Sequence, residues 1–185
     1  MSGIIEMSKI SKLLHLSGIK RKWGFFCVNK LFAGTKYFEK KRKILNSLGF
    51  QIGKNTKVVG PIECYGKLVV GDNCWIGKNF KVNGNGMVFI GNNCDIAPEV
   101  TFQTGGHKIG TAECRAGDGI CFSQTVGDGT WIGGRVTVLN DTHIGNSCVI
   151  AGCACVTRDV ENNSLVGGVP ARLIRKLDDD TNAKN

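Results

Sequence analysis

One histidine, His107, stands in the longest irregular stretch of this 185-residue sequence, between Thr104 and Thr125. An imidazole titrates near neutral pH, so a histidine there can take or give a proton during a reaction. The other two histidines are His15, in a basic segment, and His143, at an outward position of a repeat. Stretches of about twenty residues without a pattern are usually functional or disordered. The stretch 104–125 is therefore the first candidate for a reaction site.

The nine cysteines do not form a recognisable metal or disulfide motif. Their number is odd, the sequence has no CxxC, and most stand singly inside apolar sequence. That placement is typical of buried free thiols, which favours a reduced cytoplasmic setting. No metal is expected.

Charge divides the chain into two parts. Residues 1–50 hold 11 basic and 2 acidic side chains, so they account for the whole net charge of +9, and residues 51–185 are balanced. Hydrophobic residues make up 42% of the chain, which excludes a disordered protein, and no apolar run reaches the roughly 18 residues of a membrane span. No nucleic-acid motif accompanies the charge, so nucleic acid is not an expected partner.

A six-residue period organises the balanced part. Every sixth residue is aliphatic or otherwise apolar from Ile52 to Val82, again from Ile90 to Phe102, and again from Val126 to Val156. Glycine often follows, and a small residue such as Cys74, Cys94 or Cys148 comes four positions after the aliphatic residue. A period of six fits neither a helix nor a simple strand. It predicts short parallel strands joined by tight turns, three to a coil, with about five coils and these cysteines packed inward.

This pattern resembles the hexapeptide-repeat family. The resemblance implies an all-β fold, the left-handed parallel β-helix, and a homotrimer with ligand sites between subunits. We therefore expect a basic helical segment at 1–50, a β-helix at 51–166 interrupted by a long loop at 104–125, and a C-terminal segment and tail at 167–185.

Further motifs narrow the resemblance to the galactoside, maltose and nodulation-factor O-acetyltransferases and to polysaccharide O-acetyltransferases. They are Thr104-Gly-Gly-His107, then Trp131-Ile-Gly133, and finally Gly167-Gly-Val-Pro-Ala-Arg172. The resemblance implies acetyl transfer from acetyl-CoA, as co-substrate, to a sugar hydroxyl, for instance of a cell-surface polysaccharide or its precursor. It gives His107 the role of general base, without an acyl-enzyme, and backbone N–H groups around Gly133 and Gly134 that of oxyanion donors.

The resemblance also implies binding residues for both substrates. For acetyl-CoA these are a set of backbone, aromatic and basic positions in the second half of the chain: Trp131, Gly133, Gly134, Gly152, Thr157, Arg158, Pro170, Arg172 and Arg175. The three arginines can bind the phosphates of CoA, and the alternative is that they form a solvated basic face. Trp131 can contact the ligand, and the alternative is that it packs in the core. For the carbohydrate acceptor the binding residues are Asn83, Asn85, Glu113 and Arg115. The alternatives are that the two asparagines belong to an ordinary Asn-Gly turn and that Glu113 and Arg115 form an ion pair within the loop.

The basic segment has two interpretations. Residues 4–17 and 36–48 place Ile10, Leu13 and Leu14, and then Phe38, Ile44, Leu45 and Leu48, at helical spacing beside lysines. Such helices can cap the end of the coils, or they can make peripheral contact with the inner face of a membrane.

Other functions stay open from the sequence. Within the family they are N-acetylation of an amino sugar and O-acetylation of serine. A γ-type carbonic anhydrase needs three histidine ligands, whereas only His107 and His143 lie in the repeats. A non-catalytic β-helical scaffold would need neither the His107 loop nor the C-terminal arginines.

Overall fold

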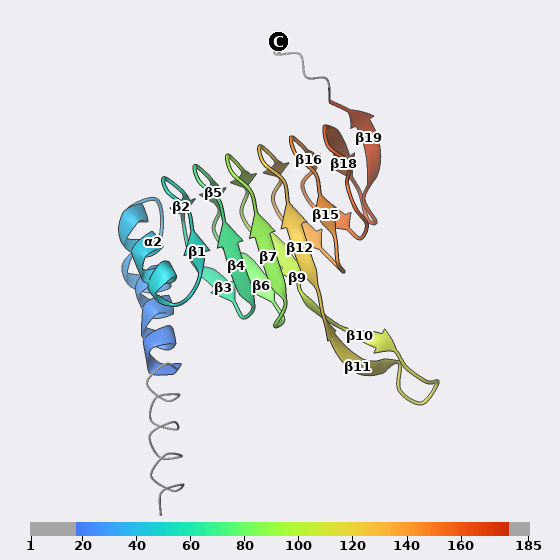
Figure 1. Ribbon diagram of the computed structural model, residues 1–185, viewed down its shortest axis with the longest axis horizontal. Helices are drawn as coiled ribbons and strands as arrows, with labels where there is room; N and C mark the ends of the chain where they lie inside the picture. Colours follow the sequence, from blue (N-terminus) through green and yellow to red (C-terminus); the bar gives the residue numbers. More distant parts are fainter. Residues whose placement is uncertain (1–17, 178–185) are drawn as a thin grey trace, which may run out of the picture.

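The computed structural model describes residues 18–177, most of which form a parallel β-helix (Figure 1). Each coil contributes one strand to each of three sheets. The first face consists of β1 (Gln51–Ile52), β4 (Lys67–Val70), β7 (Met87–Ile90), β12 (Ser123–Val126) and β15 (His143–Ile144). The second consists of β2 (Lys57–Val58), β5 (Trp75–Ile76), β8 (Asp95–Ile96), β13 (Trp131–Ile132), β16 (Val149–Ile150) and β18 (Ser164–Gly167). The third consists of β3 (Ile62–Cys64), β6 (Phe80–Asn83), β9 (Thr101–Gln103), β14 (Thr137–Val138) and β17 (Cys155–Val156).

The aliphatic residues of the six-residue period fill the interior of the coils. Ile96 is aligned with Ile76 on one side and with Ile132 on the other, and all three are at most 1% exposed. Cys74, Cys94 and Cys148 are buried as predicted, and all nine cysteines are free thiols. The predicted all-β coil fold is thus confirmed.

Five full coils are present, as predicted, since the first and third faces have five strands each. The second face has a sixth parallel strand, β18, which belongs to a partial sixth coil. This partial coil is shorter than the others, since Ile150 is aligned with Val166 and not with the residue 18 positions later, so the period of six ends there. Strand β19 (Arg172–Lys176) then turns back antiparallel to β18 and covers this end of the sheet.

A ladder of polar side chains fixes the corner between the first and second faces. The Asn92 Oδ1 accepts the Asp72 N–H at 2.9 Å, the Asp128 Oδ1 accepts the Asn92 N–H at 2.6 Å, and the Asn146 Oδ1 accepts the Asp128 N–H at 2.8 Å. A Cβ at Gly127 would lie 2.3 Å from the Asn146 Oδ1, so glycine is required beside this ladder. Each coil thereby hydrogen-bonds the turn of its neighbour.

The stretch predicted as an irregular loop is a β-hairpin. Strands β10 (Gly105–Ile109) and β11 (Ala116–Cys121) pair antiparallel and project from the body (Figure 1). Two-residue alternation is hard to see there because four glycines, Gly105, Gly106, Gly117 and Gly119, occupy the strands. The hairpin leaves the coil between β9 and β12, at the corner between the third and first faces.

Helical residues cap the first coil. Residues 18–26 are helical and continue into the π-helix η1 (Cys27–Leu31), and α2 (Phe38–Ser47) follows where a helix was predicted at 36–48. Leu45 of α2 is fully buried against the core. The helix predicted at 4–17, and His15 with it, lie outside the described residues. Within residues 18–177, no helix has the length and apolarity needed to cross a bilayer.

A buried lysine ties the helical cap to the coils. Lys41 of α2 is 0% exposed, and its Nζ donates to the carbonyl oxygens of Gly34 at 2.6 Å and Val59 at 2.9 Å. Burial lowers the pKa of Lys41 from 10.5 to about 8.

This pKa predicts a pH dependence of stability. The unfolded chain keeps Lys41 protonated up to pH near 10.5, whereas the folded chain releases that proton near pH 8. Unfolding therefore takes up a proton between these values, and the Lys41 contribution should favour folding by about 1–2 kcal/mol more at pH 9.5 than at pH 7.5. Urea unfolding of wild type and of Lys41→Met at both pH values measures the difference. A free-energy difference between the two proteins that does not change with pH would contradict this assignment.

Candidate active site

The base of the hairpin holds His107 in one defined orientation. His107 is aligned with Gly119 across the hairpin, and its Nδ1 lies 2.9 Å from the Gly117 carbonyl oxygen. A carbonyl oxygen only accepts hydrogen bonds, so in this contact Nδ1 carries the proton. In the neutral ring, Nε2 then has the free lone pair, and the exposed side chain can offer it to a substrate.

Asn83 and Asn85 lie beside His107. These three residues line a common hollow of about 420 Å³, together with Gly84, Gln103, Gly105, Gly106, Gly119, Ile120 and Cys121. The six-residue period is interrupted twice: by two extra residues between Val82 and Ile90, and by the stretch 104–125. Both interruptions lie at the corner between the third and first faces, in successive coils. The sequence thus predicted three residues that the fold brings together.

Two further residues of this hollow were missed. Gln103 is the last residue of β9, and its Oε1 is buried without a hydrogen-bond partner. Cys121 ends β11 and presents an exposed thiol. Gln103 directly follows the inward residue Phe102, so the alternation of a strand continued into the interruption could have identified it.

Glu113 and Arg115 lie farther along the hairpin, in and beside the turn that joins its strands. A hydrogen bond from Thr111 lowers the pKa of Glu113, and the Arg115 Nη1 donates to the Gly110 carbonyl oxygen at 3.4 Å. Neither residue lines the hollow of His107. The side chains of Glu113 and Arg115 form no ion pair with each other. The ion pair found in the hairpin joins Lys108 to Asp118 at 3.8 Å.

Gly134 and Gly152, which were predicted to bind acetyl-CoA, lie next to each other at the corner between the second and third faces. Because neither has a side chain, their backbone is exposed, and we call this surface the Gly134–Gly152 ridge. The Gly134 carbonyl oxygen accepts the Cys153 N–H at 2.8 Å, and a Cβ at Gly152 would lie 3.3 Å from that oxygen. In the described part of the chain, the N–H groups of Gly134 and Gly152 form no hydrogen bond. Both can therefore donate to a ligand.

Two expectations for this corner need correction. The N–H of Gly133 donates to the Ile150 carbonyl oxygen at 2.8 Å, so the stacking of coils makes it unavailable as an oxyanion donor. Trp131 is 54% exposed on the second face, which excludes the interpretation as a core residue.

The C-terminal arginines are only partly brought together. Arg158 and Arg172 line a hollow of about 240 Å³ at the last coil, between β17 and β19, whereas Arg175 lies outside it on the exposed strand β19. Within residues 18–177 none of the three is ion-paired with a carboxylate, although Asp159 and Glu161 line the same hollow. Glu161 pairs instead with Lys176 at 2.6 Å. Thr157 directly precedes Arg158, and Pro170 lies in the turn before β19.

His143 has surroundings unlike those of His107. It lies exposed on the first face, and its Nδ1 is 2.7 Å from the Thr125 Oγ1. In the part of the chain that the structure describes, no three side chains of metal-ligating type are grouped.

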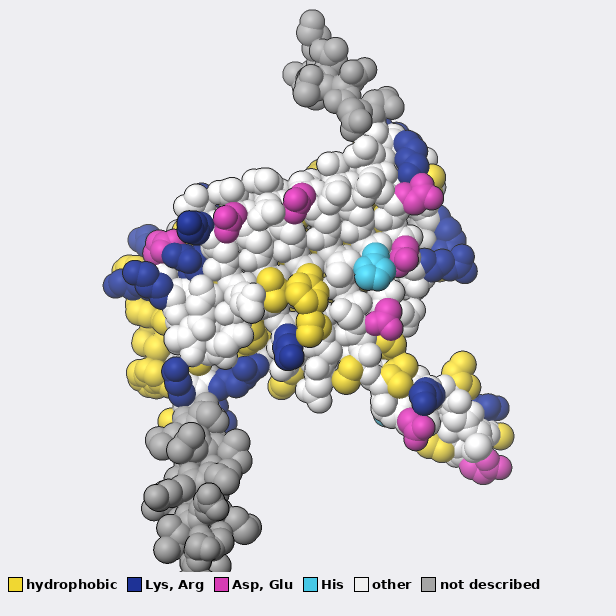
Figure 2. All heavy atoms as spheres, viewed as in Figure 1, with side chains coloured by type: hydrophobic (Ala, Val, Ile, Leu, Met, Phe, Trp, Pro, Cys, Tyr) yellow, Lys and Arg dark blue, Asp and Glu magenta, His cyan; other side chains and the backbone are white. Residues whose placement is uncertain are grey.

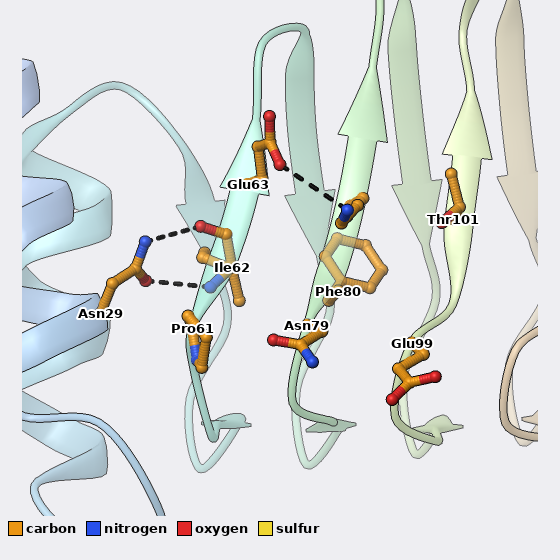
Figure 3. A pocket seen from close by; sticks show the side chains of 9 residues that line it. Asn29, Pro61, Ile62, Glu63, Asn79, Phe80, Glu99 and Thr101 are labelled. Atoms are coloured by element: carbon orange, nitrogen blue, oxygen red, sulfur yellow. Dashed lines mark hydrogen bonds and ion pairs between the residues drawn. The ribbon is translucent and has the colours of Figure 1, made fainter.

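A larger hollow, of about 630 Å³, lies on the third face near the helical cap (Figure 3). Three of its polar side chains make contacts within the chain: Asn29 holds the backbone of Ile62 through two hydrogen bonds, and Lys81 lies 3.9 Å from Glu63. None of the predicted site residues lines it.

The predicted site residues of a single chain do not all lie in one place. His107 lies where the third face meets the first, and the Gly134–Gly152 ridge lies where the third face meets the second. None of the three hollows described above is lined by both. The histidine and the ridge thus stand on opposite edges of one face.

Comparison with known proteins agrees with this architecture. The family model for the bacterial transferase hexapeptide (six repeats) matches residues 125–158. The galactoside O-acetyltransferase of Escherichia coli K12 is 33% identical over 147 residues, which span 76% of this chain and 70% of that protein.

Solved structures show the same similarity. A hexapeptide-repeat acetyltransferase of Vibrio cholerae, complexed with acetyl coenzyme A, has a TM-score of 0.76 at 25% identity, covering 89% of each chain. A galactoside acetyltransferase in complex with coenzyme A has a TM-score of 0.74 at 28% identity, covering 88% of this chain and 83% of that one. The chain therefore belongs to the family of hexapeptide-repeat acetyltransferases.

Proposed function

We propose that this protein transfers the acetyl group of acetyl-CoA to a carbohydrate hydroxyl, with His107 as general base. The observation that carries the proposal is the contact of His107 Nδ1 with the Gly117 carbonyl, which leaves Nε2 as the base beside Asn83 and Asn85. Relatives named as galactoside O-acetyltransferases, and related structures with coenzyme A or acetyl coenzyme A, support the substrates.

The residues fit a direct transfer. Nε2 of His107 takes the proton of the acceptor hydroxyl while that oxygen attacks the thioester carbonyl. The free N–H groups of Gly134 and Gly152 are the candidates to stabilise the oxyanion. When the carbon–sulfur bond breaks, the imidazolium returns the proton to the departing thiolate, so histidine ends neutral and no acyl-enzyme forms.

Acetyl-CoA would lie along the glycine ridge toward the last coil. The exposed backbone of Gly134 and Gly152 suits an extended amide-bearing arm, with Trp131 and Thr157 beside it. Arg158 and Arg172 would meet the phosphates, and Pro170 and Arg175 would flank them. Unpaired guanidinium groups at the end of the ridge support this direction.

The acceptor would lie against the hollow of His107. The amides of Asn83 and Asn85 can donate to and accept from sugar hydroxyls, and an open hollow can admit part of a longer glycan, such as a cell-surface polysaccharide or its precursor. We assign Glu113 and Arg115 to acceptor contacts made by the projecting hairpin against a neighbouring copy. Cytoplasmic localisation fits the acetyl donor and the nine free thiols.

A homotrimer would complete the site. Because His107 and the Gly134–Gly152 ridge occupy opposite edges of the third face, a cyclic arrangement can bring the edge of one copy against the other edge of the next. The hairpin projects from the coil and can bridge the two copies.

Replacing His107 by Ala should lower kcat by about 10²–10⁴-fold, because the base is lost while both binding surfaces remain. Acetyl-CoA binding and the oligomeric mass should be unchanged, as measured by calorimetry and light scattering. The matched control is His143→Ala, which should retain wild-type turnover. Turnover near the wild-type value in His107→Ala would remove the general-base assignment.

Replacing Arg172 by Ala should raise the KM for acetyl-CoA about tenfold, because one charge-assisted contact to phosphate is lost. Acetyl-dephospho-CoA, which lacks the 3′-phosphate, should be used almost as well as before. Arg42→Ala, which removes only an ion pair with Glu39 on α2, serves as the control. Equal losses with both donors would rule out a contact with that phosphate.

Two inactive variants should complement each other if the site needs two copies. Gly134→Leu places a side chain on the ridge with room for its Cβ, which would lie 3.4 Å from the Pro98 carbonyl oxygen. Mixed trimers that contain both His107→Ala and Gly134→Leu chains should recover about one third of wild-type activity, since one of their three sites combines an intact histidine with an intact ridge. Co-expression with two different tags, purification and assay give the value. No recovery in verified mixed trimers would place the whole site in one chain.

A further inference from the structure

The helical cap has an apolar face that nothing in the described chain covers. Its inner face packs on the coils: Phe25 contacts Phe50 edge-on at 5.9 Å, Val28 is fully buried, and Gly24 lies against Leu48. One packed face is enough to hold an amphipathic helix on a core. The opposite face should then be polar.

Instead, the opposite face is aromatic and aliphatic. Ile19, Trp23 and Phe26 follow one another at helical spacing and are 51%, 61% and 45% exposed. The Trp23 and Phe26 rings stack on each other at 5.4 Å. Leu31 and Tyr37, also more than half exposed, extend the surface toward α2. We call these five residues the end patch.

Basic side chains surround the end patch. Figure 2 shows hydrophobic side chains gathered at the end of the molecule that carries the helices, with Lys and Arg on either side. The exposed lysines of this segment are Lys20, Lys22, Lys30, Lys36, Lys40 and Lys43. No acidic residue occurs between residues 7 and 38, and Glu39 is paired with Arg42 at 2.8 Å. The potential around the patch is therefore positive.

We propose that the end patch binds the surface of a bilayer containing anionic lipids. Tryptophan and phenylalanine favour the boundary between headgroups and acyl chains, and lysines around them attract lipid phosphates. An aromatic face flanked by exposed lysines matches both requirements, whereas lysines are depleted at protein interfaces. The proposal does not depend on the transfer reaction.

This surface differs from the one predicted from sequence. The predicted contact used helices at 4–17 and 36–48. The first lies outside the described residues, and in the second Leu45 and Lys41 are buried against the coils. The end patch lies at the opposite end of the molecule from β19, and the hairpin projects away from the helical cap (Figure 1). Docking would leave His107 and the C-terminal arginines facing solvent.

Sedimentation of the full chain with vesicles tests the proposal. Phosphatidylcholine vesicles containing phosphatidylglycerol should bind it at least tenfold more tightly than phosphatidylcholine vesicles. Trp23→Ser with Phe26→Ser should lose at least tenfold of that binding, and so should Lys20→Glu with Lys22→Glu, which keeps the aromatic surface. The control is Ile109→Ser, which removes an apolar side chain that is 89% exposed on the hairpin, and binding should not change.

Several results would overturn the proposal. They are no binding of wild type to either vesicle, equal binding to both, or unchanged binding in the two double variants. A fall in oligomeric mass in the Trp23/Phe26 variant without loss of vesicle binding would instead assign the patch to contact between copies. Circular dichroism and turnover with a water-soluble acceptor establish folding, and the lysine variant decides the matter if the aromatic variant is unstable.

Discussion

The aliphatic side chains of successive coils stack on one another along the whole interior of this molecule. On the second face the stack runs through Ile76, Ile96, Ile132 and Ile150, all almost completely buried. Burial of such side chains contributes about 1.5–3 kcal/mol each. Because a slip of one residue would turn these side chains out of the interior, the stack fixes the register of the sheet, and with it the position of every corner residue relative to its counterpart in the next coil. The predicted functional residues stand at those corners.

Uniform stacking also explains where function can arise. At the ladder corner each turn hydrogen-bonds the next, so the N–H groups of Asp72, Asn92 and Asp128 are occupied by side-chain oxygens of the neighbouring coil. At the Gly134–Gly152 corner the missing side chains leave two N–H groups free. At the third corner, two successive coils contain residues in excess of the six-residue repeat. These residues form the Asn83–Asn85 turn and the hairpin of His107. The proposed reaction site thus lies where the repeat is interrupted.

The sequence predicted those features that repeat and missed those that depend on contacts between coils. The period of six predicted the coils and the inward cysteines, and its two interruptions identified Asn83, Asn85 and His107. The period could not show that the Gly133 N–H donates to the Ile150 carbonyl oxygen, because that hydrogen bond joins residues of different coils. It gave an irregular loop for the hairpin because glycines hide the alternation of its strands. The partial sixth coil was not predicted because its spacing is shorter than that of the repeats.

A crystal structure of the chain bound to coenzyme A tests the central claim most directly. The account predicts that the thiol sulfur lies within about 4 Å of Nε2 of His107, that this histidine belongs to a neighbouring copy, and that its Nδ1 still donates to the Gly117 carbonyl. A sulfur bound far from every His107, or a His107 whose Nε2 is engaged by its own chain, would contradict the account.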